Sequence, residues 1–269
     1  MAVAAPAPEA FDPALVETRD PVVRVEGICK RYGAVEALRD IDLQFERGKL
    51  TTLLGPSGCG KTTLLKIIAG LVPATSGRIV INDRAVTGPG PERAFVFQDF
   101  ALMPWATVLR NVAFGLELKG VAQAERNRIA RNYIEQVGLQ GFEDRYPHEL
   151  SGGMRQRVGI ARAFAVNADV LLLDEPFSAV DEQNRRKFQE DLLRLVELEG
   201  KTFIFVTHSI EEAVYVSDRI ILLSPRPGRV SNIIDPRIDR TADPDDIRRD
   251  PRYLDAVEEI WQGLRHYAE

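Results

Sequence analysis

The pattern of hydrophobic and polar positions predicts short strands that alternate with amphipathic helices. Short apolar or alternating runs are typical of strands, and they occupy residues 22–25, 41–45, 50–54, 78–81, 94–97, 170–173, 203–206, 220–223 and 230–234. Apolar residues at helical spacing follow Lys61, extend over 107–138 and recur over 188–196. Residues 243–268 are charged, and we expect them to be helical. Strands that alternate with helices in this way indicate an α/β fold with a mostly parallel sheet.

The same pattern divides the chain into three parts. Residues 1–21 are rich in alanine and proline and show little periodicity, so we expect a flexible lead. Residues 22–235 carry the alternating strands and helices, interrupted by a helical insert at about 99–165. Residues 236–269 form a short, charged and helical extension to which the sequence assigns no function.

Composition narrows the class of protein. The 269 residues include 35 Lys and Arg and 40 Asp and Glu, which gives a net charge of −5. Non-specific binding to nucleic acid needs a basic excess, so we expect no nucleic-acid partner. The two cysteines are too few for a disulfide framework or a zinc cluster. No apolar run approaches the ~18 residues of a membrane span, and residues 1–21 lack the pattern of a secretory signal. We therefore expect a cytosolic chain that can dock on a membrane component.

Residues 55–62, Gly-Pro-Ser-Gly-Cys-Gly-Lys-Thr, are the clearest candidate site and match the pattern G-x-x-x-x-G-K-[ST]. Glycines let backbone N–H groups turn toward phosphate oxygens, and the start of the next helix offers unpaired N–H groups. We expect Lys61 to reach the β- and γ-phosphates and the Thr62 hydroxyl to bind Mg²⁺. An ordinary glycine-rich turn is the alternative, but the preceding strand and following helix favour a phosphate site. The predicted nucleotide-binding residues here are Gly55, Pro56, Ser57, Gly58, Cys59, Gly60, Lys61, Thr62 and Thr63.

Two acidic residues, Asp174 and Glu175, follow the apolar run at 170–173. A buried parallel strand would deliver both at its carboxyl end, where ligands bind in α/β sheets. We expect Asp174 to be a Mg²⁺ partner and Glu175 to orient and deprotonate the attacking water. Two solvated acids after a strand are the alternative, and the phosphate site at 55–62 favours the functional interpretation.

The segment Leu150-Ser151-Gly152-Gly153-Met154-Arg155-Gln156-Arg157 resembles the signature of the ATP-binding cassette (ABC) ATPases. The family's other motifs occur in the same order. They are the phosphate loop at 55–62, Phe97-Gln98, the acidic pair at 174–175, Ser178-Ala179-Val180-Asp181 and Val206-Thr207-His208. The resemblance covers about residues 22–235. It implies a P-loop NTPase core with a mostly parallel sheet, an antiparallel β subdomain and a helical insert.

The resemblance also implies roles for residues outside the phosphate loop, with ATP and Mg²⁺ as ligands. Tyr32 would stack on adenine, Gln98 would sense Mg²⁺ and water, and His208 would contact the γ-phosphate. Taken alone, Tyr32 could be a surface tyrosine and His208 a structural histidine. ATP would lie between the phosphate loop of one copy and the signature of a second, in a head-to-tail homodimer. The signature residues are Ser151, Gly152 and Gly153, and Asp181 would bridge the two copies.

The segment at 151–153, Cys59 and two histidines carry separate expectations. Ser-Gly-Gly at 151–153, considered in isolation, is more typical of a capped helix after a loop than of a phosphate site. Alkylation of Cys59 is expected to block ATP binding, and ATP to protect the thiol. His148 and His266 fit no motif and are interpreted as structural or exposed.

Three segments narrow the resemblance to the importer ATPases for nitrate, aliphatic sulfonates and taurine: 100–105, 108–116 and 223–230. This implies permease subunits, a periplasmic or surface solute-binding protein as an indirect partner, and a peripheral position at the cytoplasmic face of the cell membrane. Val180 and Arg110 depart from the commoner leucine and acidic residue of the family. Trp105 and Phe114 could pack in the core or line a groove for the permease. The alternative is the ATPase of another ABC transporter, either an exporter or another importer, and a non-transport ABC ATPase ranks below it.

Overall fold

The computed structural model describes residues 17–240 and 242–265. Most of the expected lead, and His266, lie outside the described residues. The helices are α1 (Lys61–Ile68), α2 (Val108–Leu118), α3 (Gln123–Gln136), the 3-10 helix η2 (Pro147–Glu149), α4 (Gly152–Ala165), α5 (Glu182–Glu199), α6 (Ile210–Val216), α7 (Pro244–Ile247) and α8 (Pro251–Arg265). Among the described residues, no helix is both long and apolar enough to span a bilayer.

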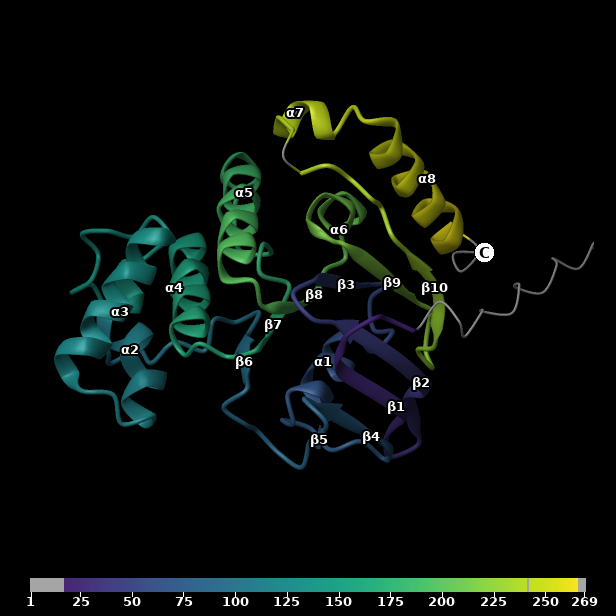
Figure 1. Cartoon of the computed structure of the whole chain (residues 1–269), viewed down its shortest axis with the longest axis horizontal. Helices are drawn as coiled ribbons and strands as arrows, with labels where there is room; N and C mark the ends of the chain where they lie inside the picture. Colours follow the sequence, from purple (N-terminus) through teal and green to yellow (C-terminus); the bar gives the residue numbers. More distant parts are fainter. Residues whose placement is uncertain (1–16, 241, 266–269) are drawn as a thin grey trace, which may run out of the picture.

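A six-stranded sheet forms the centre of the fold (Figure 1). Its order is β10 (Val230–Ile234), β9 (Arg219–Leu223), β3 (Leu50–Leu54), β8 (Thr202–Val206), β7 (Val170–Asp174) and β6 (Arg93–Val96). All neighbours pair in parallel except β10, which pairs antiparallel with β9. The predicted mostly parallel sheet is therefore confirmed, with one antiparallel edge strand.

A second sheet is four-stranded and antiparallel. Its order is β2 (Val35–Glu46), β1 (Pro21–Tyr32), β4 (Ser76–Ile81) and β5 (Arg84–Ala85). The apolar runs at 22–25, 41–45 and 78–81 all fall in this sheet. Their inward residues pack on α1 and on one face of the six-stranded sheet, which positions β1 and β2 beside the start of α1 (Figure 1).

The central strands are buried on both faces, which explains their unbroken apolar runs. In β8, Phe203 and Phe205 belong to the core under helices α2 to α6, whereas Ile204 and Val206 belong to the core shared with the antiparallel sheet. All five residues of β8 are buried. A strand of this kind fixes the position of the loop at its carboxyl end.

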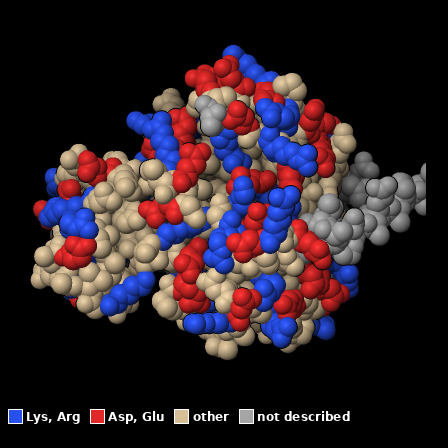
Figure 2. Space-filling model, viewed as in Figure 1, with Lys and Arg blue, Asp and Glu red and all other residues tan. Residues whose placement is uncertain are grey.

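The helical insert forms a separate lobe of α2, α3 and α4 (Figure 1). The helical spacing over 107–138 falls on two helices, α2 and α3, and Gly120 takes a left-handed φ of 74° just after α2. Trp105 is 74 % exposed, so the core alternative is wrong for this residue; Phe114 is 38 % exposed. Figure 2 shows charges of both signs interspersed over the face it presents, with broad uncharged areas on this lobe.

The C-terminal extension packs on α6 through buried side chains of α8, namely Tyr253, Ala256 and Ile260. The helical prediction for 243–268 holds for α7 and α8 within the described residues. Because α6 begins two residues after His208, the C-terminal extension packs on the helix that directly follows this predicted catalytic residue.

Candidate functional site

Four segments with predicted functional residues leave the same edge of the six-stranded sheet. The phosphate loop follows β3, Gln98 follows β6, Asp174 ends β7 with Glu175 next to it, and His208 follows β8. These four strands are parallel neighbours, so their carboxyl ends meet at one edge. Along the chain these residues extend from Gly55 to His208, and the parallel pairing of the strands brings their loops together.

The phosphate loop depends on glycines for steric reasons. Gly58 and Gly60 have φ of 76° and 107°, in the region that other residues rarely adopt. A Cβ on Gly60 would lie 2.6 Å from Leu38 Cδ2, and one on Gly55 would lie 2.6 Å from the Leu223 carbonyl oxygen. Gly60 precedes the first residue of α1 without a side-chain cap. The first N–H groups of α1 therefore face the loop, as an anion site requires.

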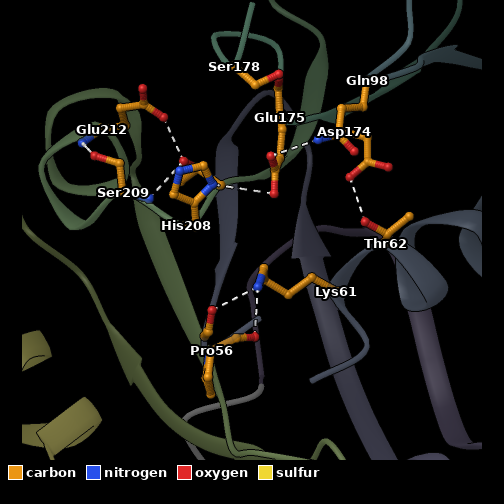
Figure 3. A network of polar contacts seen from close by, with 12 residues as sticks. Pro56, Lys61, Thr62, Gln98, Asp174, Glu175, Ser178, His208, Ser209 and Glu212 are labelled. Atoms are coloured by element: carbon orange, nitrogen blue, oxygen red, sulfur yellow. Dashed lines mark hydrogen bonds and ion pairs between the residues drawn. The ribbon is translucent and has the colours of Figure 1, made fainter. Parts of the chain in front are cut away.

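The Lys61 side chain is buried and lies along the loop (Figure 3). Its Nζ donates hydrogen bonds to the carbonyl oxygens of Gly55 (2.7 Å) and Pro56 (3.1 Å). Cys59 packs beneath the same loop with only 1 % of its surface exposed, and burial is the largest factor that raises the pKa of its thiol. Burial and the raised pKa both oppose the expected alkylation of Cys59, because the reagent must reach the sulfur and because the thiolate is the reactive form.

Thr62 and Asp174 are in direct contact across the edge of the sheet. Thr62 Oγ1 donates a hydrogen bond of 2.8 Å to Asp174 Oδ1, and Asp174 is 3 % exposed. Burial raises the pKa of Asp174, opposed by the Thr62 hydrogen bond and the charges of Lys66 and Lys61. Mg²⁺ binds hydroxyl and carboxylate oxygens and keeps several of its waters. This pair of oxygen ligands beside the phosphate loop fits that preference.

Glu175 is the centre of a polar network formed with Gln98 and His208 (Figure 3). Gln98 Nε2 donates to Glu175 Oε2 at 3.1 Å, and His208 Nδ1 lies 3.4 Å from Glu175 Oε1. The Glu175 backbone has a left-handed φ of 47°, and its N–H donates to the Val206 carbonyl oxygen at 2.9 Å. Strained backbone of this kind is typical of residues held for a function. The structure thus gathers the three predicted catalytic residues around one carboxylate.

A second network continues from His208 into α6. Thr207 Oγ1 donates to Glu212 Oε2 at 2.6 Å, and Ser209 caps α6 by accepting from the Glu212 N–H at 3.2 Å. Arg185 Nε lies 3.8 Å from Glu212 Oε1, and its Nη2 donates to the Val180 carbonyl oxygen at 3.2 Å. Residues 206–209 are therefore connected to the segment at 178–181.

Burial raises the pKa of Glu212, and it is the largest factor acting on this carboxyl group. The Thr207 hydrogen bond and the charges of Arg185 and His208 oppose it, whereas the Glu175 charge adds to it. Sequence reasoning did not select either Arg185 or Glu212. The only available signal was a charged residue four positions after each of Asp181 and His208, which is a common spacing on helices.

A cavity of about 430 Å³ opens beside the phosphate loop. Tyr32, Val35 and Ala37 line one part of the cavity, the phosphate loop lines another, and Glu175 also lines it. Tyr32 is 50 % exposed, and Lys30 Nζ lies 4.7 Å from the centre of its ring. The remaining lining residues are Ser57, Gly58, Gly60, Lys61, Thr62, Thr63 and Arg226. Val35, Ala37 and Arg226 were not predicted, because only the pairing of β2 and the β9–β10 loop against the phosphate loop places them there.

The signature segment lies outside that lining. Ser151 caps α4, where its Oγ accepts a hydrogen bond from the Met154 N–H at 3.2 Å. Gly152 and Gly153 pack against Ala179 and Val180, so a Cβ on Gly152 would lie 3.2 Å from the Ala179 carbonyl oxygen. Asp181 caps α5 by accepting from the Asn184 N–H at 3.0 Å, a role the sequence analysis did not anticipate. His148 is exposed and stacks on Tyr146, as expected for a residue outside the motifs.

Comparisons with known proteins agree with this geometry. The profile of the ABC transporter family matches residues 38–178. The taurine import ATP-binding protein TauB of Escherichia coli is 51 % identical over 209 residues, which cover 78 % of this chain and 82 % of TauB. The uncharacterized ABC transporter ATP-binding protein MJ0412 of Methanocaldococcus jannaschii is 50 % identical over 225 residues, which cover 82 % of this chain and 84 % of that protein.

Solved structures support the same assignment. The dimeric ATP-binding cassette MJ0796, in a post-hydrolysis state with ADP and Pi, superposes with a TM-score of 0.71 at 33 % identity and covers 79 % of this chain and 98 % of that one. CbiO1 of Clostridium perfringens, part of an ABC transporter complex, gives a TM-score of 0.73 at 28 % identity, over 81 % of this chain and 90 % of that one. The predicted fold class and resemblance are confirmed: this chain belongs to the ABC transporter family, as one of its ATP-binding ATPases.

Proposed function

We propose that this chain is the ATP-hydrolysing subunit of an importer that takes up a small anion such as nitrate, a sulfonate or taurine. The observation that carries the ATPase mechanism is the convergence of Gln98, Glu175 and His208 beside the Lys61 loop. The similarity to TauB supports the importer class and the kind of solute.

In the proposed mechanism, Tyr32 stacks on adenine and the phosphate loop holds the phosphates, with Lys61 on the β- and γ-phosphates. Thr62 and Asp174 would hold Mg²⁺, with Gln98 as a further contact, and the ion supplies charge that offsets the phosphate oxygens. Glu175 accepts a proton from water as the water oxygen bonds to the γ-phosphorus. The bond from the γ-phosphorus to the bridging oxygen breaks, which gives ADP and phosphate. His208 contacts the γ-phosphate and, through its position 3.4 Å from Glu175 Oε1, helps to orient that carboxylate.

The test of this mechanism is the Glu175→Gln variant, which keeps the shape of the side chain and removes the base. We expect ATP turnover to fall at least ~100-fold, since a positioned base contributes ~10²–10⁴-fold. ATP affinity should stay close to that of the wild type, whereas Lys61→Ala should weaken binding itself. Glu197→Gln is the matched control, because Glu197 is an exposed carboxylate of α5. Near-normal turnover of Glu175→Gln would remove Glu175 from this role.

We propose further that two copies form head-to-tail sites, with Ser151, Gly152 and Gly153 of one copy facing the phosphate loop of the other, and Asp181 at the junction. Their separation from the cavity lining within one copy supports this arrangement. Mixing two inactive variants, Lys61→Ala and Ser151→Phe, should restore about a quarter of the activity, because half of the dimers would carry one intact site of two. No recovery on mixing at a concentration where the dimer forms would argue against shared sites.

The helical insert is the proposed contact with permease subunits at the cytoplasmic face of the membrane. A solute-binding protein would deliver the solute to the permease from the opposite face. The exposed Trp105 and Leu118, 74 % and 73 % exposed, support this placement on the helical lobe. The test is ATP-driven uptake of nitrate, taurine and sulfonates into vesicles that contain this chain and its partner permease. Export of the solute, or turnover independent of any permease, would favour the exporter or non-transport alternatives.

A further inference from the structure

The loop between β9 and β10, residues 224–229, lies directly against the phosphate loop. The Gly228 N–H donates to the Ala37 carbonyl oxygen at 3.0 Å, and the Arg39 N–H donates to the Gly228 carbonyl oxygen at 3.0 Å. A Cβ on Gly228 would lie only 2.1 Å from the Cys59 carbonyl oxygen. The 224–229 loop is therefore held between β2 and the phosphate loop, with no space for a side chain at Gly228.

The ends of the 224–229 loop are also joined to each other. The Ser224 N–H donates to the Arg229 carbonyl oxygen at 2.9 Å, and the Arg229 N–H donates to Ser224 Oγ at 3.0 Å. The single hydroxyl proton of Ser224 is shared between the carbonyl oxygens of Pro225 (3.1 Å) and Pro227 (3.4 Å). These bonds fix the backbone on both sides of Arg226, so the direction of its side chain is set by a closed loop.

Arg226 lines the cavity beside the phosphate loop together with Tyr32 and Gly58. Its Nη2 and Nε donate to the same acceptor, the Gly58 carbonyl oxygen, at 3.1 and 3.3 Å. A guanidinium has five N–H donors, so this single acceptor leaves donors for another group. Among the described residues, Arg226 forms no ion pair, whereas Arg229 on the same loop has its Nη2 3.6 Å from Asp40 Oδ2.

We propose that Arg226 is a nucleotide-binding residue whose guanidinium contacts phosphate oxygens of ATP at the end nearest the ribose. The proposal rests on the proposed function of the cavity as the ATP site. The 224–229 loop is bonded to Ala37 of β2, and the Arg226 side chain is bonded to Gly58 of the phosphate loop. Arg226 therefore lies between the part of the cavity lined by β2, where the base would lie, and the part lined by the phosphate loop. A guanidinium with free donors and no carboxylate partner pairs strongly with phosphate.

The test compares ATP affinity in Arg226→Gln, Arg226→Lys and the matched control Arg229→Gln, over a range of salt concentrations. Arg226→Gln keeps an amide donor for the Gly58 carbonyl oxygen and removes the charge. It should raise the Kd for ATP about tenfold, since hydrogen bonds to charged groups are strong. It should also make the Kd less dependent on salt, because screening acts on the lost charge. Arg226→Lys should keep the salt dependence of the wild type, and Arg229→Gln should change the Kd by less than about twofold.

The outcomes separate this inference from the function on which it rests. Equal ATP affinity in Arg226→Gln and the wild type, with binding lost in Lys61→Ala, would overturn the role of Arg226 and leave the ATP site intact. Weaker binding with an unchanged salt dependence would also overturn it, because it would mean that Arg226 only braces the phosphate loop. A wild-type protein that does not bind ATP would overturn the proposed function as well. An unchanged thermal midpoint in Arg226→Gln confirms that each comparison is made on folded protein.

Discussion

The contact between Gly228 and the phosphate loop can be tested by adding one methyl group. In Gly228→Ala, the new Cβ would lie 2.1 Å from the Cys59 carbonyl oxygen and 3.3 Å from Leu38 Cδ2. Ordinary contacts of a Cβ begin at 3.4 Å, and the opposing atom is backbone rather than the end of a flexible side chain. The 224–229 loop and the phosphate loop must therefore separate by about 1 Å, an overpacking change.

The cost can be estimated from the contacts that this separation affects. Overpacking costs about 1–3 kcal/mol. The two backbone hydrogen bonds of Gly228, with Ala37 and Arg39, contribute about 0.5–1.5 kcal/mol each and would lengthen or break. Together these effects predict a loss of roughly 2–5 kcal/mol in the free energy of unfolding. For a chain of this size, that corresponds to a fall of roughly 5–15 °C in the thermal midpoint.

The assay is thermal and urea unfolding of the wild type, Gly228→Ala and the control Gly88→Ala. Gly88 has no atom within 4 Å of the position of an added Cβ, so its alanine variant should unfold like the wild type or slightly above it. We also expect weaker ATP binding in Gly228→Ala, because the displaced loop carries Arg226. A Gly228→Ala protein that is as stable as Gly88→Ala would refute the steric reasoning.

Three further predictions concern buried groups. Burial raises the pKa of Glu212 above 4.5, its ordinary value, so the folded state binds more protons than the unfolded state, and stability should fall as the pH rises from that ordinary pKa through the raised one. Glu212→Gln should reduce this dependence of the thermal midpoint on pH, and Glu211→Gln, at an exposed residue, should not. A maleimide should label Cys59 slowly in native protein and rapidly in urea, in mass spectra taken without ATP; rapid native labelling would contradict its burial. Phe177→Ala should lower the free energy of unfolding in urea by about 3–5 kcal/mol, and Phe142→Ala, at a partly exposed residue, should lower it much less.

The sequence determined the elements and the order of the motifs in this protein. Apolar runs marked the strands because central strands such as β7 and β8 are buried on both faces and tolerate few polar residues. The glycines of 55–62 marked the phosphate loop because left-handed backbone and close approach exclude a side chain there. The helical periodicity over 107–138 did not by itself mark the break at Gly120 between α2 and α3.

Only the tertiary structure decided which distant residues meet. Gln98, Glu175 and His208 share one network because β6, β7 and β8 are parallel neighbours and end at the same edge, a fact that strand composition does not encode. Arg226 reaches the cavity because the β9–β10 loop is bonded to β2 and lies on the phosphate loop. Local sequence fixes the backbone conformation of each segment, through steric limits and burial, whereas these side-chain contacts depend on pairing between segments far apart in the chain.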